Sequence, residues 1–507
     1  MISMNKKTLI EQFCYLSDTN PDAIALQQDT TLVSYAELSH KVSQVSALFN
    51  TLGLLAGDRI ALAIDNSIDY VTAFYAAWKI GAVVVALNPQ AKIYEIEKML
   101  FQCQASCFIA DKLDQSYITQ LAQKKIRLIS LSNSKHEDVT NWHQAFDLQG
   151  DSRYFQTGKS RLAQIIYTSG TTGNPKGVSL THGNLLSNVR DIISYLKLSA
   201  NDSVLNVLPF HYCYGNSVLH THLYVGAKVI LAGSMAYPQQ VVNSLRSLRA
   251  TGFSGVASTY SLLLSHSDWS KSPPALRYLT QAGGPMGKEL TLKLVASSHE
   301  ATQLFVMYGQ TEATARITWL PPSMLNTKLG SAGIALKNIQ LEVRNKKNVR
   351  VASYQKGEVY IKGPNVMQGY WKNSTATKEV VIDGWLKTGD LGFLDDDGYL
   401  FLQGRNSDMI KVGAHRINPL ELEEIINKID FVHESAVIGI DDPLLGQSLC
   451  AFIVGEESKA NLFAIKKHCN HYFPTHKIPK DIQWLSRLPK TASGKIKRYQ
   501  LNRQKEF

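Results

Sequence analysis

The sequence has few of the features that place a protein in a membrane or outside the cell. Its longest apolar stretch, residues 80–87, is far shorter than the ~20 residues that a bilayer-spanning helix needs. The amino terminus lacks the apolar block and small-residue cleavage site of a secretory signal. We therefore expect a soluble, cytoplasmic protein with no stable membrane insertion.

Cysteine is scarce as well. Six cysteines are spread over 507 residues, and only Cys103 and Cys107 lie close together in the sequence. No second pair and no cluster of histidines stands nearby, which argues against a metal site and a disulfide framework. We expect reduced, mostly buried thiols and no structural metal.

Acidic residues are outnumbered by basic ones, which gives a net charge of +11 and an isoelectric point near 9.1. From His471 onward, nine lysines and arginines stand against two acidic residues. No basic-aromatic motif accompanies them, so we expect no nucleic-acid partner. A basic surface for phosphorylated small molecules or for an acidic carrier protein fits this charge, and so does a merely solvated basic surface.

The chain does contain enough apolar residues for more than one core. With 507 residues and 44% apolar content it exceeds one ordinary domain, so we expect at least two. Strand-like residues 59–64 and helix-like residues 70–78 alternate, and residues 80–89 end the block as a buried strand followed by proline. This alternation predicts an α/β fold with a mainly parallel sheet.

One stretch, YTSGTTGNPKGV at residues 167–178, has the composition of an anion-binding loop. It lies between a strand-like run and Thr181, whose hydroxyl can cap a new helix. Three glycines let backbone N–H groups turn toward one point, hydroxyl side chains add donors, and Lys176 adds positive charge. These features indicate polyphosphate binding, although a solvated surface turn has a similar composition.

The spacing of this stretch is not that of a Walker A loop. That motif has four residues between its first glycine and Gly-Lys-Ser/Thr, whereas here Gly170 is followed five residues later by Pro175 and then Lys176. The kinase-type loop is therefore excluded. The candidate nucleotide ligands are Thr168, Ser169, Gly170, Thr171, Thr172, Gly173 and Lys176.

With this signature the sequence resembles the adenylate-forming superfamily: acyl-CoA synthetases, aryl-CoA ligases, luciferases and the adenylation domains of nonribosomal peptide synthetases. The resemblance extends over nearly the whole chain. It implies a large N-terminal ATP- and acyl-binding domain of packed α/β subdomains, residues 1–404, and a small mobile α+β lid domain, residues 405–507. It also places the hinge of the lid near Ser407.

The segment YGQTEA, residues 308–313, offers four separate chemical groups. An aromatic ring can stack on adenine, a glycine permits a turn, a hydroxyl can bind the α-phosphate, and a carboxylate can hold Mg²⁺ beside phosphate oxygens. The resemblance assigns these roles, in this order, to Tyr308, Gly309, Thr311 and Glu312.

Two further sites are implied in nucleotide binding. The small residues of the turn TQAGGPM allow a flat ligand to approach the backbone, and the resemblance places Gly283, Gly284 and Pro285 along adenine. The resemblance also assigns the two ribose hydroxyls to Asp390, with Arg405 reaching the same sugar. An aspartate after a glycine is also a common turn residue.

Four residues are implied in the chemical steps. By resemblance, His211 gates the tunnel between ATP and the acyl substrate, although a loop histidine needs no such role. Lys495, in a glycine-containing basic loop, is assigned to bridge the substrate carboxylate and the α-phosphate; a basic tail that happens to contain glycine is the plain alternative. Lys411 and Gly413 are placed on the face that admits a thiol after the second domain has rotated.

Three positions depart from what such enzymes often carry. Gly215 occupies the slot where amino-acid-activating relatives place an aspartate, so a substrate ammonium group would lack its partner. Ser407 stands at the hinge, where many relatives have aspartate or lysine. Ala414 replaces a glycine beside which pantetheine passes, and its methyl group narrows that passage unless Gly413 adjusts.

These observations predict an AMP-forming acid–thiol ligase that uses ATP and Mg²⁺. It would activate a fatty or other non-α-amino acid to an acyl-adenylate with release of pyrophosphate, then transfer the acyl group to CoA or to the phosphopantetheine arm of an acyl carrier protein. Fatty acid metabolism is the expected setting. A stand-alone amino-acid adenylation enzyme is the alternative, and a non-catalytic basic binding module is a third interpretation.

Overall fold

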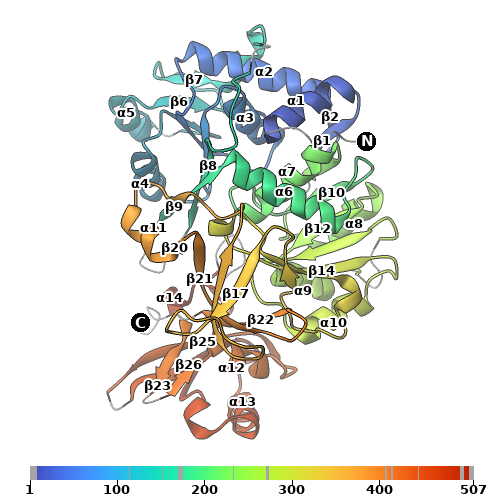
Figure 1. Cartoon of the computed structure of the whole chain (residues 1–507), viewed down its shortest axis with the longest axis vertical. Coiled ribbons are helices and arrows are strands. Elements are labelled where there is room, and N and C mark those ends of the chain that lie inside the picture. The colour runs from blue at the N-terminus through green and yellow to red at the C-terminus, as the bar shows by residue number, and fades with distance from the viewer. Residues whose placement is uncertain are drawn as a thin grey trace.

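The structure is a computed structural model. It describes residues 8–113, 115–151, 154–168, 175–231, 233–269, 273–405, 408–412, 415–443, 445–490 and 496–501. Four β-sheets organise these residues, three in the large N-terminal part and one in the small C-terminal part (Figure 1). This arrangement confirms the predicted fold class.

The nine-stranded sheet lies between two layers of helices. Its strands, in spatial order, are β16 (Ile334–Ala335), β15 (Thr318–Leu320), β14 (Gln303–Tyr308), β13 (Tyr278–Gln281), β12 (Gly252–Gly255), β10 (Ser203–Asn206), β11 (Lys228–Leu231), β1 (Ile24–Gln28) and β2 (Thr31–Ser34). The strands from β14 to β1 run parallel, as predicted. Because side chains alternate along a strand, Leu205 and Val204 face different cores. The core that contains Leu205 includes residues of α8 (Pro238–Ser247), α9 (Ala257–His266) and α10 (Lys288–Ala296). The core that contains Val204 includes residues of α6 (His182–Leu196) and α7 (Cys213–Val225).

The eight-stranded sheet is also packed between helices. Its strands, in spatial order, are β19 (Gly369–Tyr370), β9 (Lys176–Thr181), β8 (Leu162–Thr168), β4 (Val83–Ala86), β3 (Arg59–Ala63), β5 (Cys107–Ala110), β6 (Arg127–Ser130) and β7 (Val139–Asn141). Strand β4, predicted from the apolar run at residues 80–87, is buried over all its residues because cores lie on both faces. One core includes α1 (Leu9–Thr19), α2 (Tyr35–Thr51) and α3 (Ile68–Lys79), and the other includes α4 (Ile93–Cys103) and α5 (Gln115–Gln123).

A smaller antiparallel sheet follows in the chain. Its strands are β17 (Gln340–Arg344), β18 (Gly357–Lys362), β21 (Trp385–Leu394), β20 (Val381–Ile382) and β22 (Leu400–Arg405), and helix α11 (Ser374–Val380) precedes β20. Arg405, the last residue of β22, pairs with Asp390 across the strands. The predicted boundary between residues 404 and 405 thus falls at the end of this sheet, and it stays a prediction.

The C-terminal part has its own sheet and its own apolar clusters. Its elements are β23 (Ile410–Val412), β24 (His415–Ile417), α12 (Pro419–Ile426), β25 (Val432–Asp442), β26 (Gly446–Gly455), α13 (Lys459–Tyr472), β27 (Asp481–Trp484) and α14 (Arg498–Leu501). The two apolar clusters contain only residues from Ile410 onward. An ion pair between Arg498 Nη2 and Glu423 Oε2, 2.9 Å apart, ties α14 to α12.

None of the helices in the described ranges has the length and the apolar run that a bilayer crossing requires. Helix α2, with 17 residues, stays below the ~20 residues of a spanning helix. Short 3₁₀ helices are found at Trp142–Asp147, Thr311–Ala313, Pro322–Met324 and Thr475–Lys477.

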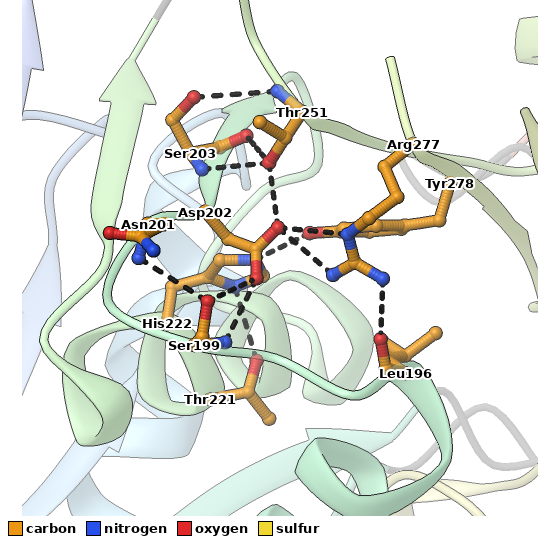
Figure 2. Close-up of polar contacts among 10 residues, drawn as sticks. All are labelled: Leu196, Ser199, Asn201, Asp202, Ser203, Thr221, His222, Thr251, Arg277 and Tyr278. Atoms are coloured by element: carbon orange, nitrogen blue, oxygen red, sulfur yellow. Dashed lines mark hydrogen bonds and ion pairs between the residues drawn. The ribbon is translucent and has the colours of Figure 1, made fainter. Parts of the chain in front are cut away.

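A polar network joins the amino-terminal ends of three parallel strands (Figure 2). The Asp202 carboxylate accepts hydrogen bonds from Arg277 Nη2 and from the Thr251 hydroxyl, both at 2.9 Å. It also accepts the Ser199 backbone N–H at 2.8 Å, and Arg277 donates to the carbonyl of Leu196 at the end of α6. Asp202 is 6% exposed, so these bonds replace most of its hydration. The network fixes β10, β12 and β13 at the ends opposite to the candidate site.

Asp202→Asn tests the strength of this network. We expect the variant to lower the free energy of unfolding by about 2–4 kcal/mol, because Arg277 and Thr251 lose a charged acceptor in a buried position. The midpoint of thermal unfolding, followed by circular dichroism, measures the loss. Asp22→Asn, at an exposed aspartate, is the matched control. Equal midpoints for the wild type and Asp202→Asn would contradict the stabilising role.

Four histidines of the large part are kept neutral by burial. Loss of hydration lowers the pKa of His220 to about 3 and the pKa values of His182, His211 and His222 to about 4. His222 Nε2 lies 2.6 Å from the Tyr278 hydroxyl (Figure 2). In an unfolded chain the pKa of histidine is about 6.5. Between about pH 4 and 6.5 the unfolded state therefore binds more protons than the folded state.

This difference predicts that stability falls as the pH drops through that window. At about pH 5 each of these histidines should lower the free energy of unfolding by on the order of 1–2 kcal/mol relative to neutral pH. The thermal midpoint of His220→Gln should therefore change less between pH 7.5 and pH 5 than that of the wild type. His266→Gln, at an exposed histidine, should behave as the wild type does. A full wild-type drop in His220→Gln would count against this explanation.

Candidate active site

The predicted phosphate loop falls, in the sequence, between strands β8 and β9. The two strands pair antiparallel, with Thr168 opposite Lys176. The Thr168 hydroxyl donates to the Lys176 carbonyl at 3.4 Å. The remaining predicted ligands of the loop lie outside the described residues: Ser169, Gly170, Thr171, Thr172 and Gly173.

The segment that follows differs from the expectation of a loop between a strand and a helix. Residues 176–181 form strand β9, because they pair with β8 on one side and β19 on the other. Helix α6 begins only at His182. Thr181 caps it as predicted, since its Oγ1 accepts the N–H of Asn184 at 3.1 Å.

Tyr370 joins Lys176 to the carboxylate predicted for magnesium. Lys176 Nζ lies 5.0 Å from the centre of the Tyr370 ring, in cation–π contact. The Tyr370 hydroxyl donates to Glu312 Oε1 at 2.9 Å. Burial and the Glu312 charge raise the pKa of this hydroxyl, so it stays a donor. Tyr370 was not predicted from the sequence, because nothing in the spacing of residues indicates that β19 pairs with β9.

The loop after β14 presents Glu312. Met367 donates its backbone N–H to the Glu312 carbonyl at 2.9 Å, which fixes the loop. A side chain at Gly309 would not fit, because its Cβ would lie 1.9 Å from the Ala315 carbonyl oxygen. The glycine predicted for a turn is thus required by a close approach of two backbone segments.

Asp390 is shared by two predicted nucleotide ligands. Its Oδ2 accepts the Tyr308 hydroxyl at 2.6 Å, and its Oδ1 accepts Arg405 Nε at 3.0 Å. The three residues come from β14, β21 and β22, and Asp390 is 8% exposed. Burial and the Asp390 charge raise the pKa of the Tyr308 hydroxyl, which keeps it protonated. The structure therefore brings Tyr308, predicted for adenine, together with Asp390 and Arg405, predicted for the ribose.

The predicted adenine turn follows β13. Gly283 has a φ of +90°, a conformation that favours glycine. Gln281 Nε2 donates to the Gly284 carbonyl at 2.8 Å, which holds the turn. A Cβ at Gly284 would meet no atom within 4 Å, and Gly284 and Pro285 are exposed. The turn thus leaves its backbone open to a flat ligand.

His211 lies after β10 in a turn held by Asn66. The Asn66 side chain accepts the Phe210 N–H and donates to the Leu208 carbonyl, both at 2.8 Å. Burial lowers the pKa of His211 to about 4, so its ring is neutral near pH 7. Its Nε2 is buried and has no hydrogen-bond partner among the described residues. This nitrogen is available to a ligand.

Helix α7 begins beside the predicted α-phosphate ligand. The Thr311 hydroxyl donates to Cys213 Sγ at 3.5 Å. A Cβ at Gly215 would lie 2.3 Å from the Pro209 carbonyl oxygen, so an aspartate does not fit in this slot. Asn216 Nδ2, on the same turn, is buried without a hydrogen-bond partner in the described part of the chain. The local packing therefore excludes an aspartate at position 215.

The C-terminal candidates are not joined to these residues by any contact within the described ranges. Lys411 is exposed in β23, and its backbone N–H donates to Gln447 Oε1 at 2.9 Å. The other calls in this part lie outside the described residues: Ser407, Gly413, Ala414 and Lys495.

The donor set fits a nucleotide with magnesium. Of the Glu312 carboxylate, only Oε1 has a hydrogen-bond partner among the described residues, which leaves Oε2 for a cation. Mg²⁺ is commonly held by one or two carboxylates together with substrate phosphates. No group of three or more acidic, histidine or cysteine side chains that could hold a metal occurs in the described ranges. The magnesium ligands that we expect are therefore the Glu312 carboxylate and oxygens of the bound phosphates.

Comparisons with known proteins identify the family. The profile of the AMP-binding enzyme family matches residues 16–371, and that of the AMP-binding enzyme C-terminal domain matches residues 421–495. The chain is 30% identical over 486 residues to a 2-succinylbenzoate–CoA ligase of Bacillus cereus and 31% identical over 484 residues to one of Bacillus cytotoxicus. Each alignment covers 95% of both chains.

Solved structures show the same similarity. An o-succinylbenzoate CoA synthetase from Bacillus subtilis, in complex with its acyl-adenylate intermediate, has a TM-score of 0.86 at 27% identity and is aligned over 98% of both chains. The same enzyme with ATP and a magnesium ion has a TM-score of 0.85 at 27% identity, over 97% of this chain and 98% of that one. A benzoate CoA ligase from Burkholderia xenovorans has a TM-score of 0.87 at 25% identity, over 98% and 99%.

These matches confirm the predicted resemblance and the predicted enzyme class. The two profiles leave residues 372–420 unmatched, so they do not test the boundary at residue 404. The chain belongs to the AMP-binding enzyme family, and it is an AMP-forming acid–thiol ligase.

Proposed function

We propose that the enzyme joins ATP and a carboxylic acid into an acyl-adenylate with release of pyrophosphate, and then transfers the acyl group to the thiol of CoA. The observation that carries this proposal is that Tyr370 contacts both Lys176, through its ring, and Glu312, through its hydroxyl. A cation and a carboxylate that both contact one tyrosine suit a triphosphate with magnesium. Relatives solved with ATP and magnesium and with an acyl-adenylate support these ligands.

The first step has to overcome repulsion between two anions, the acid and the triphosphate. Two like unit charges 4 Å apart repel by about 4 kcal/mol at an effective dielectric constant of 20. In this proposal Lys176 and the predicted phosphate loop bind the outer phosphates, and Thr311 donates to the α-phosphate. Magnesium held by Glu312 supplies further charge neutralisation when it is bound. These groups offset the negative charge as it moves to pyrophosphate.

The nucleoside is assigned to the residues around Asp390. The carboxylate has lone pairs left after its bonds to Tyr308 and Arg405, and these can accept the ribose hydroxyls. Adenine would lie between the Tyr308 ring and the open backbone of Gly283, Gly284 and Pro285. The neutral His211, with its unpaired Nε2, is assigned to the entrance between ATP and the acid.

The second step is assigned to a rotation of the C-terminal part. Lys495 would bridge the acid and the α-phosphate during adenylation and then withdraw. A face that contains Lys411 would replace it and admit the thiol. A hinge near Ser407 agrees with the separate apolar clusters of the C-terminal part, because two cores can move relative to each other.

For the acid we propose an aromatic keto acid of the 2-succinylbenzoate type. The support is the name of the relatives that align over 95% of the chain. The comparisons give no support to the expected link with fatty acid metabolism. Gly215 also disfavours the amino-acid alternative, because no aspartate fits in the slot that would pair with an ammonium group.

The test is a product assay with purified enzyme, magnesium, ATP and CoA. The acids are 2-succinylbenzoate, benzoate, a medium-chain fatty acid and an amino acid mixture. We expect AMP and an acyl-CoA thioester, identified by mass spectrometry, with 2-succinylbenzoate. Thioester from the fatty acid alone would overturn the proposed acid, and amino-acid-dependent AMP would favour the alternative. If no acid gave AMP, the proposed adenylation reaction would be wrong.

Lys495→Ala separates the two steps. We expect adenylation to fall by on the order of 100-fold or more, because a cation at the developing charge is lost. Thioester formation from preformed acyl-adenylate should remain near the wild-type rate. Single-turnover assays of each step measure this difference. An equal loss in both steps would contradict the assignment of Lys495 to adenylation alone.

Ala414→Gly tests the passage for pantetheine. If the methyl group narrows this passage, the variant should form thioester several-fold faster from preformed acyl-adenylate, with adenylation unchanged. The readout is the rate of acyl-CoA formation at saturating CoA. An unchanged or lower rate would mean that the alanine does not obstruct the thiol.

A further inference from the structure

A buried arginine that follows the Thr311–Glu312 loop has no acidic partner in the described part of the chain. Arg316 is 3% exposed. Its Nε lies 3.3 Å from Met307 Sδ, its Nη1 lies 3.4 Å from the Ala315 carbonyl, and its guanidinium carbon lies 4.1 Å from the centre of the Tyr214 ring. Among the described residues no aspartate or glutamate pairs with it, although the Tyr195 side chain also hydrogen-bonds with it. Buried arginines are almost always paired, because an isolated charge loses its hydration.

The backbone of Arg316 is held in place from two sides. The Asn188 side chain accepts its N–H at 3.2 Å and donates to its carbonyl at 2.9 Å. Asn365 Nδ2 donates to the same carbonyl at 3.0 Å. Gly309 allows the approach, since a Cβ there would lie 2.9 Å from Arg316 Cα. The guanidinium is therefore held in place next to the loop that carries Thr311 and Glu312.

Two adjacent residues at the start of α7 connect Arg316 with the proposed reaction centre. Cys213 accepts the hydroxyl of Thr311, which is assigned to the α-phosphate, and Tyr214 stacks on the Arg316 guanidinium. The Tyr214 hydroxyl in turn donates to the Thr280 carbonyl at 2.9 Å. An acid whose activated carboxyl group lies at Thr311 would extend along this turn toward Arg316.

A small cavity adjoins the guanidinium between α6, α7 and the parallel strands. Its volume of about 10 Å³ is that of roughly one water molecule, so it suits a small polar group and not a ring. Its described lining contains no acidic side chain. Burial lowers the pKa of His222 in this lining to about 4, which keeps the ring neutral near pH 7. The other polar lining residues carry hydroxyl groups: Tyr195, Ser217, Thr221, Ser254, Tyr278 and Thr280.

We propose that Arg316 determines specificity by pairing with a second carboxylate at the far end of the acid, so that the enzyme prefers dicarboxylic acids over monocarboxylic acids of the same shape. This inference rests on the proposed function and names its substrate class. A planar carboxylate matches the guanidinium geometry and would supply the missing acidic partner. The acid named for the relatives, 2-succinylbenzoate, has two carboxyl groups.

The test compares kcat/KM for AMP formation between matched acids. In the first set the diacid 2-succinylbenzoate is compared with two monoacids that each lack one of its carboxyl groups, 2-butanoylbenzoate and 4-oxo-4-phenylbutanoate. In the second set the diacid adipate is compared with the monoacid hexanoate. The wild type should prefer a diacid over its better monoacid by about 10- to 100-fold, the range expected for a charged hydrogen bond. In Arg316→Gln this preference should fall close to unity, mainly through KM. Arg316→Lys, which keeps the charge, should retain part of it.

Arg350→Gln, at an exposed arginine, is the matched control and should keep the wild-type preference. Thermal midpoints and retained monoacid turnover show whether each variant is folded, and Arg316→Met serves as a second variant without charge. An active wild type that does not prefer any diacid overturns the proposal. So does an equal loss of diacid and monoacid turnover in Arg316→Gln, which is the result of a purely structural role. If the wild type forms no AMP with any acid, the proposed function fails, and this proposal falls with it.

Discussion

The Asp390 carboxylate is the contact on which the arrangement of the site depends. It connects β14, which leads into the Glu312 loop, with the small sheet that ends at Arg405. Without this charge the buried Tyr308 hydroxyl would lose its acceptor and Arg405 its ion pair. Because Arg405 borders the predicted hinge near Ser407, the same contact links the predicted nucleotide ligands with the predicted start of the second domain.

Charge is arranged differently at the two ends of the nine-stranded sheet. At the amino-terminal ends Asp202 and Arg277 form an ion pair and need no ligand (Figure 2). Beyond the carboxyl end of β14, Arg316 contacts a tyrosine ring and, within the described ranges, no acid. Lys176, in β9 of the eight-stranded sheet, likewise contacts the ring of Tyr370, whose hydroxyl reaches Glu312 after β14. Ligands of open α/β sheets bind outside the carboxyl ends of the strands. An anionic nucleotide and an anionic acid would complete the charge balance there, which gives a physical reason for the position of the reaction.

The sequence predicted well those features whose cause is local. The Thr181 cap, the buried strand from residues 80–87 and the loop after Tyr308 follow from short patterns, and the structure has all three. Contacts between distant strands were not predictable. Tyr370 reaches Glu312 only because β19 joins β9, and this pairing also explains why a strand follows the phosphate loop. Arg316 carries no motif, and its meaning comes from the absence of an acidic partner among the described residues of the folded chain.

In the proposed reaction these groups let a carboxylate attack the α-phosphate of ATP. The most direct measurement is acid-dependent exchange of labelled pyrophosphate into ATP, with magnesium present and every thiol left out. We expect rapid exchange with the cognate acid and none without it, because acyl-adenylate formation is reversible and precedes the thiol step. Thioester synthesis that releases ADP and phosphate, with no exchange of pyrophosphate, would contradict this mechanism.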